Sequence, residues 1–337
     1  MIYGRELPGY PYNLKAKLTR CIVYGQRFLF GKLLRRFSDH APLPLDYAGQ
    51  AANDVVRSLL ESDKPCLIAR FGSGEMEATL RGLDVQAPGG LLRKIGRMCM
   101  GKSGPFWWDN SIRAGLVWVA GYFPETNDAL NRFANRVVED ARELDILASW
   151  LAGEKRLRKI YFPNVQAIFL DDLTAFWFNH PWTGALKGRR VLVIHPFADT
   201  IRQQYARRRK LFEDPEVLPD FDLITYRSVQ SAIGLQTPYK TWFDALDKMC
   251  ADIANIDFDV ALIGCGAYGM SIGAFVKREL RKQAVHLGGI SQMIFGIKGR
   301  RWDIRPSFSR YYNDAWSRPL DHERPENFLL TENGGYW

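Results

Sequence analysis

The chain has 337 residues, of which 47% are hydrophobic and 25% charged, and these values exclude a disordered, collagen-like or disulfide-scaffold protein. The net charge is +9, but eight basic and two acidic residues fall within residues 1–40, so most of the excess lies there. Because the rest of the chain is nearly neutral, we expect no nucleic-acid partner. The length fits one large α/β unit with additions.

The five cysteines form no Cys-x-x-Cys pair and lie mostly among apolar residues, which favours reduced thiols in the cytoplasm. No early apolar run predicts a cleaved signal peptide. The 17 uncharged residues from Val260 to Val276 include four glycines. We therefore interpret them as a strand, a turn and a packed helix rather than a membrane span.

Residues 14–37 carry apolar side chains at near-helical spacing among lysines and arginines, a pattern typical of a basic amphipathic helix. Gly25 and Gly31 lower the helix propensity of this segment. Two interpretations stay open: the helix docks on the anionic inner face of the cytoplasmic membrane, or it packs on its own protein. Pro42, Pro44 and Gly49 predict a linker, so 1–45 is expected to be a separate segment.

The elements that follow alternate between strands and helices. The first half predicts a helix at 51–60, a strand at 65–70 and helices at 74–81 and 125–144, with an irregular basic stretch before the last. The second half predicts strands at 190–195, 222–226, 259–263 and 284–287, separated by helices at 198–213, 240–255 and 269–282. This alternation predicts an α/β domain over 46–300 with a mostly parallel Rossmann-like sheet, helices on both faces, and a C-terminal extension over 301–337. Ligands of such sheets bind at the carboxyl ends of the strands.

A Gly-x-Gly-x-x-Gly motif follows one predicted strand and opens a helix, so the backbone amides of Gly264, Gly266 and Gly269 are placed to receive a phosphate. A dinucleotide site also needs an acidic residue about 20 positions further on. The next strand end offers His286 and Leu287 instead. We therefore expect no NAD, and glycines that only allow tight packing are the structural alternative.

The turn after the strand at 65–70 places Arg70, two glycines, Glu75 and Glu77 at the same sheet edge. Arg70 is suited to clamp a phosphate, and Glu75 to bind a cation or act as a base. The alternative for both carboxylates is a favoured position in the first turn of a helix.

Two further motifs have alternative explanations that involve no catalysis. His195 and Thr200 flank the turn after the strand at 190–195, although a lone histidine there is more often structural than catalytic. Residues 96–103 match the Walker A pattern, but a poor strand precedes them and Gly104-Pro105 is a poor helix start. We interpret that match as a coincidence.

The segment from Arg70 to Glu75, together with the glycine loop and the His286-Leu-Gly-Gly-Ile290 end, resembles the GT-D type of glycosyltransferase. The likeness covers most of 50–300. The blocks at 193–197, 263–269, 286–289, 295–302 and 332–337 look like a bacterial surface-polysaccharide biosynthesis group of this architecture.

The resemblance implies a nucleotide-sugar donor, a glycan or lipid-linked acceptor, and Mn²⁺ or Mg²⁺ on an Asp-x-Glu motif. Ser73 stands at the Asp position of that motif and Glu75 at its Glu position, which leaves Glu75 as the metal ligand. We expect catalytic roles for Glu75, Glu77 and His195. The residues expected to bind the donor are Arg70, Gly72, Ser73, Thr200, Gly264, Gly266, Tyr268, Gly269, His286 and Lys298.

Three other functions remain as alternatives. One is an NAD(P)-dependent oxidoreductase that uses the glycine loop at 264–269. Another is a P-loop phosphotransferase that uses Lys102, and the last is a noncatalytic scaffold docked at the membrane by residues 14–37.

Overall fold

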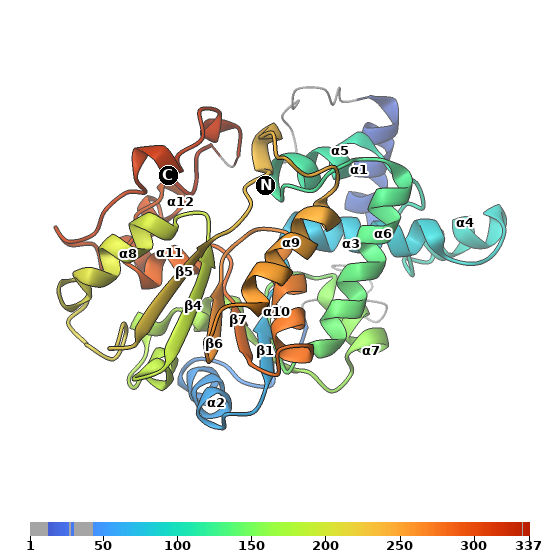
Figure 1. Ribbon diagram of the computed structural model, residues 1–337. Helices are drawn as coiled ribbons and strands as arrows, with labels where there is room; N and C mark the ends of the chain where they lie inside the picture. The colour runs from blue at the N-terminus through green and yellow to red at the C-terminus, as the bar shows by residue number, and fades with distance from the viewer. Residues whose placement is uncertain (1–12, 27, 30–42, 332) are drawn as a thin grey trace.

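The computed structural model describes residues 13–26, 28–29, 43–331 and 333–337. Its centre is a seven-stranded sheet in the order β3-β2-β1-β7-β6-β4-β5, in which every neighbouring pair is parallel (Figure 1). The expected Rossmann-like α/β architecture is therefore confirmed. The strands are β1 (Cys66–Ala69), β2 (Ile146–Ser149), β3 (Gln166–Phe169), β4 (Arg190–His195), β5 (Asp222–Arg227), β6 (Val260–Ile263) and β7 (Gln283–His286).

The central strands are buried on both faces because their apolar side chains alternate between two cores. In β1, Leu67 and Ala69 join the core on one face, whereas Cys66 and Ile68 join the core on the other. This is the period of two that a strand imposes, and it explains why these strands are continuous apolar runs in the sequence.

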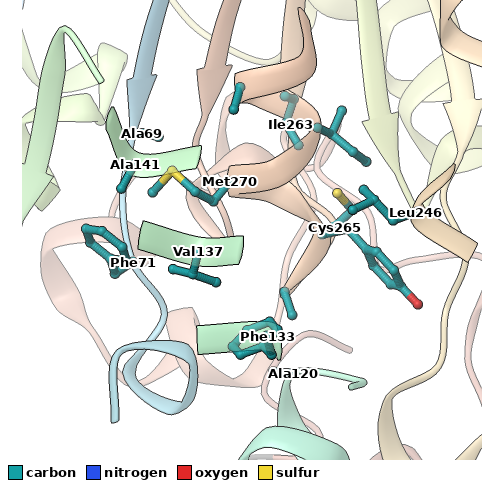
Figure 2. Close-up of a cluster of buried hydrophobic side chains, with 14 of the residues drawn as sticks. Ala69, Phe71, Ala120, Phe133, Val137, Ala141, Leu246, Ile263, Cys265 and Met270 are labelled. Atoms are coloured by element: carbon teal, nitrogen blue, oxygen red, sulfur yellow. The ribbon is translucent and has the colours of Figure 1, made fainter. Parts of the chain in front are cut away.

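Four long helices cover the first face of the sheet. Phe133 and Val137 of α6, Leu246 of α9 and Met270 of α10 meet strand residues in one cluster (Figure 2). Leu157 of a fifth helix, α7, belongs to the same core. The helices are α3 (Ser73–Gln86), α6 (Asn127–Asp140), α7 (Glu154–Tyr161), α9 (Trp242–Ala254) and α10 (Tyr268–Arg278).

The second face is covered by α2, α8 and the C-terminal part of the chain. Val56 of α2, Ile201 of α8 and Met293 of α11 pack on it together with Trp302 and Trp316. The C-terminal residues thus share the second core with the sheet. The helices are α2 (Gln50–Glu61), α8 (Ala198–Ala206), α11 (Ile290–Ile294), α12 (Arg300–Asp303) and α13 (Pro306–Ser309).

The stretch expected to be irregular contains α4 (Leu91–Cys99), α5 (Asn110–Ala114) and a π-helix at Gly115–Val119. Before the domain lies α1 (Leu14–Gln26), which confirms the first part of the expected basic helix. Residues 30–37 of that expected helix lie outside the described residues.

Two expected helices end earlier than predicted. The one expected at 125–144 ends at Asp140, and the chain then enters β2, which was not expected. The one expected at 198–213 ends at Ala206 and is followed by a 3₁₀ turn. Apolar periodicity alone does not mark these ends, because the apolar residues beyond them continue into a strand or a turn.

The interpretation of residues 260–276 as a strand, a turn and a packed helix is confirmed. Residues 260–276 form β6, a turn and most of α10, and no helix within the described ranges is long and apolar enough to cross a membrane. The five cysteines are unpaired, with Cys66 and Cys265 buried.

The topology creates crevices at the carboxyl edge of the sheet. The chain leaves β4 toward α8 on the second face, but it leaves the neighbouring β6 toward α10 on the first face. The adjacent pair β7 and β1 diverges in the same way, toward α11 and α3. Ligands of open α/β sheets bind where neighbouring connections separate like this.

Candidate functional site

A cavity of about 1040 Å³, partly open to solvent, lies at this carboxyl edge. The residues that follow β1, β4, β6 and β7 form its floor, and Tyr336 and Trp337 from the C-terminal segment contribute to its wall. Nine residues predicted from the sequence line it: Arg70, Gly72, Ser73, Glu75, His195, Gly264, Gly266, Tyr268 and His286.

Arg70 follows β1 and is one cation of the cavity. Its guanidinium carbon lies 5.7 Å from the centre of the Trp150 ring, and Trp150 is fixed because its Nε1 donates to the Phe71 carbonyl at 2.8 Å. The Arg70 Nε atom is buried and has no hydrogen-bond partner among the described residues. A buried guanidinium nitrogen in this condition is suited to bind an anionic ligand.

Arg301 is the second cation, and it lies 4.6 Å from the centre of the Tyr336 ring. Both arginines flank the two-glycine turn after β7. A Cβ atom at Gly288, whose φ is +58°, would lie 2.9 Å from Arg70 Nε, and a Cβ at Gly289 would lie 3.1 Å from Arg301 Nη1. The two glycines therefore leave room for both guanidinium groups beside one short stretch of backbone.

The glycine loop after β6 has two functions in the structure. Gly264 and Gly266 line the cavity, and Gly266 has the left-handed φ of +59°. Gly269 does not line the cavity, but a Cβ there would lie 2.2 Å from His286 Nε2, so this glycine lets the imidazole pack against α10. Tyr268 is fixed between the Trp242 ring, 5.0 Å away, and the Ser231 hydroxyl at 3.0 Å.

His195 lines the cavity as a neutral imidazole. Its Nδ1 accepts a hydrogen bond from the Phe197 amide at 2.9 Å, which leaves the proton on Nε2. Burial lowers the pKa of His195 to about 3. The side chain is therefore suited to donate a hydrogen bond to a ligand and poorly suited to accept a proton.

His286 is buried beneath the same cavity, and both of its ring nitrogens are without a hydrogen-bond partner in the described part of the chain. Burial, together with the nearby Arg70 charge, lowers its pKa to about 3. The Ser228 hydroxyl also lines the cavity and is buried without a partner there. The His286 ring, the Ser228 hydroxyl and Arg70 Nε are therefore buried polar groups at one site that make no hydrogen bond to the described residues.

The two carboxylates expected at the site, Glu75 and Glu77, differ in their position relative to the cavity. Glu75 is the single acidic residue in the cavity lining, and it bends back over Gly72, where a Cβ would lie 1.9 Å from its Oε2. Glu77 lies outside the lining, and burial raises its pKa to about 7. Mg²⁺ at phosphate sites is held by one or two protein carboxylates together with phosphate and water oxygens, so among the described residues Glu75 is the carboxylate of this cavity that would hold a divalent cation on a bound diphosphate.

Within the described residues, one group of side chains has metal-ligand spacing: Asp199, His322 and Glu323. None of them lines the cavity. Glu323 accepts from the Asp199 amide at 2.8 Å, and the Asp199 carboxylate contacts Arg202, Arg227 and His322. The Asp199 carboxylate therefore already pairs with nearby cations, and the Glu323 carboxylate already accepts hydrogen bonds from backbone amides.

Two predicted donor-binding residues lie away from the cavity. The Thr200 hydroxyl donates to Glu323 and accepts from the Leu320 amide at 2.9 Å, so it fastens the C-terminal segment to α8. The Lys298 ammonium lies 5.3 Å from the centre of the Tyr312 ring. Neither side chain belongs to the cavity lining.

Sequence reasoning missed Trp150, Arg301, Tyr336 and Trp337 as site residues. The C-terminal pair is held by its backbone, because the Arg300 amide donates to the Trp337 carbonyl at 3.2 Å and Gln292 Nε2 donates to the Tyr336 carbonyl at 2.7 Å. These residues follow no strand that the sequence predicted, so no local signal placed them at the sheet edge.

The Walker A pattern at 96–103 has the wrong structural context. Gly96 lies inside α4, and the preceding residues are helical rather than a strand. A phosphate-binding loop of this kind joins a strand to a helix, so the interpretation of this match as a coincidence is supported.

The comparisons with known proteins identify no relative. No family model matches the sequence, and neither the curated proteins nor the solved structures include a significant match. The function therefore has to be argued from the cavity itself.

Proposed function

We propose that the protein is a glycosyltransferase that moves a sugar from a nucleotide-sugar donor to a polysaccharide or glycolipid acceptor. The observation that carries the proposal is the pair of arginines, Arg70 and Arg301, on either side of Gly288–Gly289 in a cavity with one carboxylate. Guanidinium groups beside exposed backbone are suited to a diphosphate. The resemblance to GT-D enzymes supports a nucleotide sugar as the molecule that carries it.

The chemistry follows from this charge distribution. In the transfer, the bond between the anomeric carbon and the diphosphate oxygen breaks, and a bond to the acceptor oxygen forms. Negative charge develops on the departing diphosphate, where Arg70 and Arg301 stabilise it, and the His195 Nε2 proton adds a hydrogen bond. Glu75 is the base that we propose for the acceptor proton, because it is the carboxylate that lines the cavity.

A thermal-shift panel of nucleoside diphosphates and nucleotide sugars, with Mg²⁺, with Mn²⁺ and with a chelator, tests the ligand class. At a ligand concentration 100 times Kd, binding adds about 2.7 kcal/mol to the stability. We expect at least one nucleotide sugar to stabilise the protein and to be hydrolysed or transferred, and comparison with the chelator sample measures whether this binding needs a divalent cation. No response to any nucleotide would refute the proposal.

Arg70→Gln and Arg301→Gln should each weaken nucleotide binding about tenfold or more, because each removes one charged hydrogen-bonding group from the diphosphate. Arg209→Gln is the matched control, since Arg209 is exposed and pairs with Asp220 away from the cavity. Equal binding by all three variants would show that the arginines do not hold the ligand.

The oxidoreductase alternative rests on the glycine loop, which does follow β6 and open α10. Fluorescence titration with NADH tests it in the same preparation. The cavity lining places no carboxylate after β7 for the ribose hydroxyls, so we expect no saturable NADH binding.

A further inference from the structure

Helix α4 lies outside both core layers and projects from one side of the molecule (Figure 1). None of its residues is buried. Its apolar side chains instead face solvent, with Leu91 64% exposed, Leu92 84% and Ile95 37%. Two adjacent leucines this exposed on a helix that buries none of its residues indicate a surface whose partner is another molecule.

Helix α1 also exposes apolar side chains, and its C-terminal residue Gln26 contacts the end of α4. Leu14 is 82% exposed, Leu18 51% and Phe28, just beyond the helix, 63%. The inward side of α1 is fastened near the end of α4, because Gln26 Nε2 donates to the Met98 carbonyl at 2.5 Å and to the Ser103 carbonyl at 3.0 Å. We call the six apolar residues Leu14, Leu18, Phe28, Leu91, Leu92 and Ile95 the α1–α4 surface.

The charged residues in the two sequence segments that carry this surface have one sign. The sequence contains no Asp or Glu from 7 to 38 or from 85 to 108. The second of these stretches carries Arg93, Lys94, Arg97 and Lys102, and Lys15 and Lys17 lie exposed on α1. Exposed apolar side chains surrounded by lysine and arginine are the composition that binds anionic lipid headgroups and buries apolar groups at the acyl boundary.

We propose that the α1–α4 surface docks the protein on an anionic lipid bilayer, with Leu91 and Leu92 buried in the interface. A second copy of this chain is the less suitable occupant, because two such surfaces would bring lysines and arginines together with no local carboxylate to neutralise them. The docking surface is distinct from the sugar-transfer proposal, and either can fail without the other. It also gives α4, which was expected to be irregular, a function of its own.

The test is sedimentation of the full chain with vesicles of phosphatidylcholine alone and of phosphatidylcholine mixed with phosphatidylglycerol. We expect binding to the anionic vesicles only. The double variant L91S/L92S should weaken it at least about tenfold, because the apolar surface of two leucines is no longer transferred from water into the bilayer. Ile304→Ser is the matched control, because Ile304 is 82% exposed elsewhere on the molecule. Circular dichroism and the urea midpoint check that each variant is folded.

A charge variant tests the electrostatic part. R93Q/K102Q should weaken binding about tenfold and flatten its dependence on salt. Both side chains are exposed, and the substitutions remove two positive charges that would otherwise be attracted to the anionic headgroups. Lys187→Gln, an exposed lysine outside the surface, should bind like wild type.

Three results would overturn the proposal. The first is a wild-type chain that does not bind anionic vesicles, and the second is a folded L91S/L92S variant that binds them like wild type. The third is a concentration-dependent dimer, detected by analytical ultracentrifugation, that L91S/L92S abolishes while vesicle binding is unchanged. That last outcome would assign the surface to self-association.

Discussion

Protonation of the buried histidines should oppose folding as the pH falls, and His286→Asn should remove a measurable part of this effect. His195 and His286 have pKa values of about 3 in the folded protein, against an ordinary value of 6.5, because burial disfavours the charged ring. Below pH 6.5 the unfolded chain gains a proton on each ring that the folded chain does not. Each histidine therefore costs up to about 1.4 kcal/mol of stability per pH unit, or about 2.3 kcal/mol between pH 6.5, where the unfolded ring is half protonated, and pH 4.5.

Wild-type stability alone does not reveal this effect, because Glu77 and Glu154 act in the opposite direction. Burial raises the pKa of each carboxyl from 4.5 to about 7, so the folded chain holds the extra proton and gains stability as the pH falls from 7 to 4.5. The measurement is the difference between variant and wild type. Urea unfolding should show His286→Asn losing about 2.3 kcal/mol less than wild type between pH 6.5 and 4.5.

The control is His180→Asn, which removes a histidine whose side chain is 83% exposed and whose left-handed φ of 49° suits asparagine. Its free energy of unfolding should run parallel to that of wild type from pH 6.5 to 4.5. A His286→Asn curve that is also parallel to wild type would refute the argument that this imidazole stays neutral when the chain is folded.

Three further predictions concern buried groups. Glu154→Gln should be more stable relative to wild type at pH 8 than at pH 4.5, by about 3 kcal/mol, because the amide imitates the protonated carboxyl and does not ionise. Urea unfolding that shows the same difference between variant and wild type at both pH values would contradict this. Glu323→Ala removes the acceptor for two amides at the start of α8 and should cost about 3 kcal/mol, measured as a fall in Tm of about 4 °C. Gly269→Ala should cost about 1–3 kcal/mol because the His286 ring must move, whereas Gly96→Ala, with open space around its Cβ, should cost nothing; equal Tm values for the two would argue against the close contact.

Most of the strands that could be predicted are buried on both faces, although the buried β2 was missed and the edge strand β5 was predicted. Val191 to Ile194 and Val260 to Ile263 are uninterrupted apolar runs, and that pattern arises because each side of the strand packs on a core. β3 was missed because it is an edge strand with exposed Gln166 and Phe169, so its sequence lacks that run. Helix α4 was missed because none of its residues is buried in a core and because glycines flank and interrupt it.

The candidate site was predictable where a residue directly follows a buried strand. Arg70, His195 and Gly264 satisfy this rule, and the parallel sheet brings them to one edge. The rule fixes a residue's position but not the direction of its side chain. Thr200 follows the same turn as His195 and points to Glu323 instead, and Arg301 reaches the cavity from a segment whose placement depends on the whole second core.

The strand order has a consequence for how the molecule is made. Among the described strands β1 comes first in the chain and β7 comes last, yet the two are neighbours in the sheet, with Cys66 opposite Gln283 in the register. The centre of the sheet therefore cannot close until synthesis has passed residue 286, and the cavity wall waits for residues 336 and 337. Pairings this distant in sequence form slowly and leave apolar edges exposed meanwhile. We therefore expect the apolar edge of β1 to stay exposed in the nascent chain until β7 has left the ribosome.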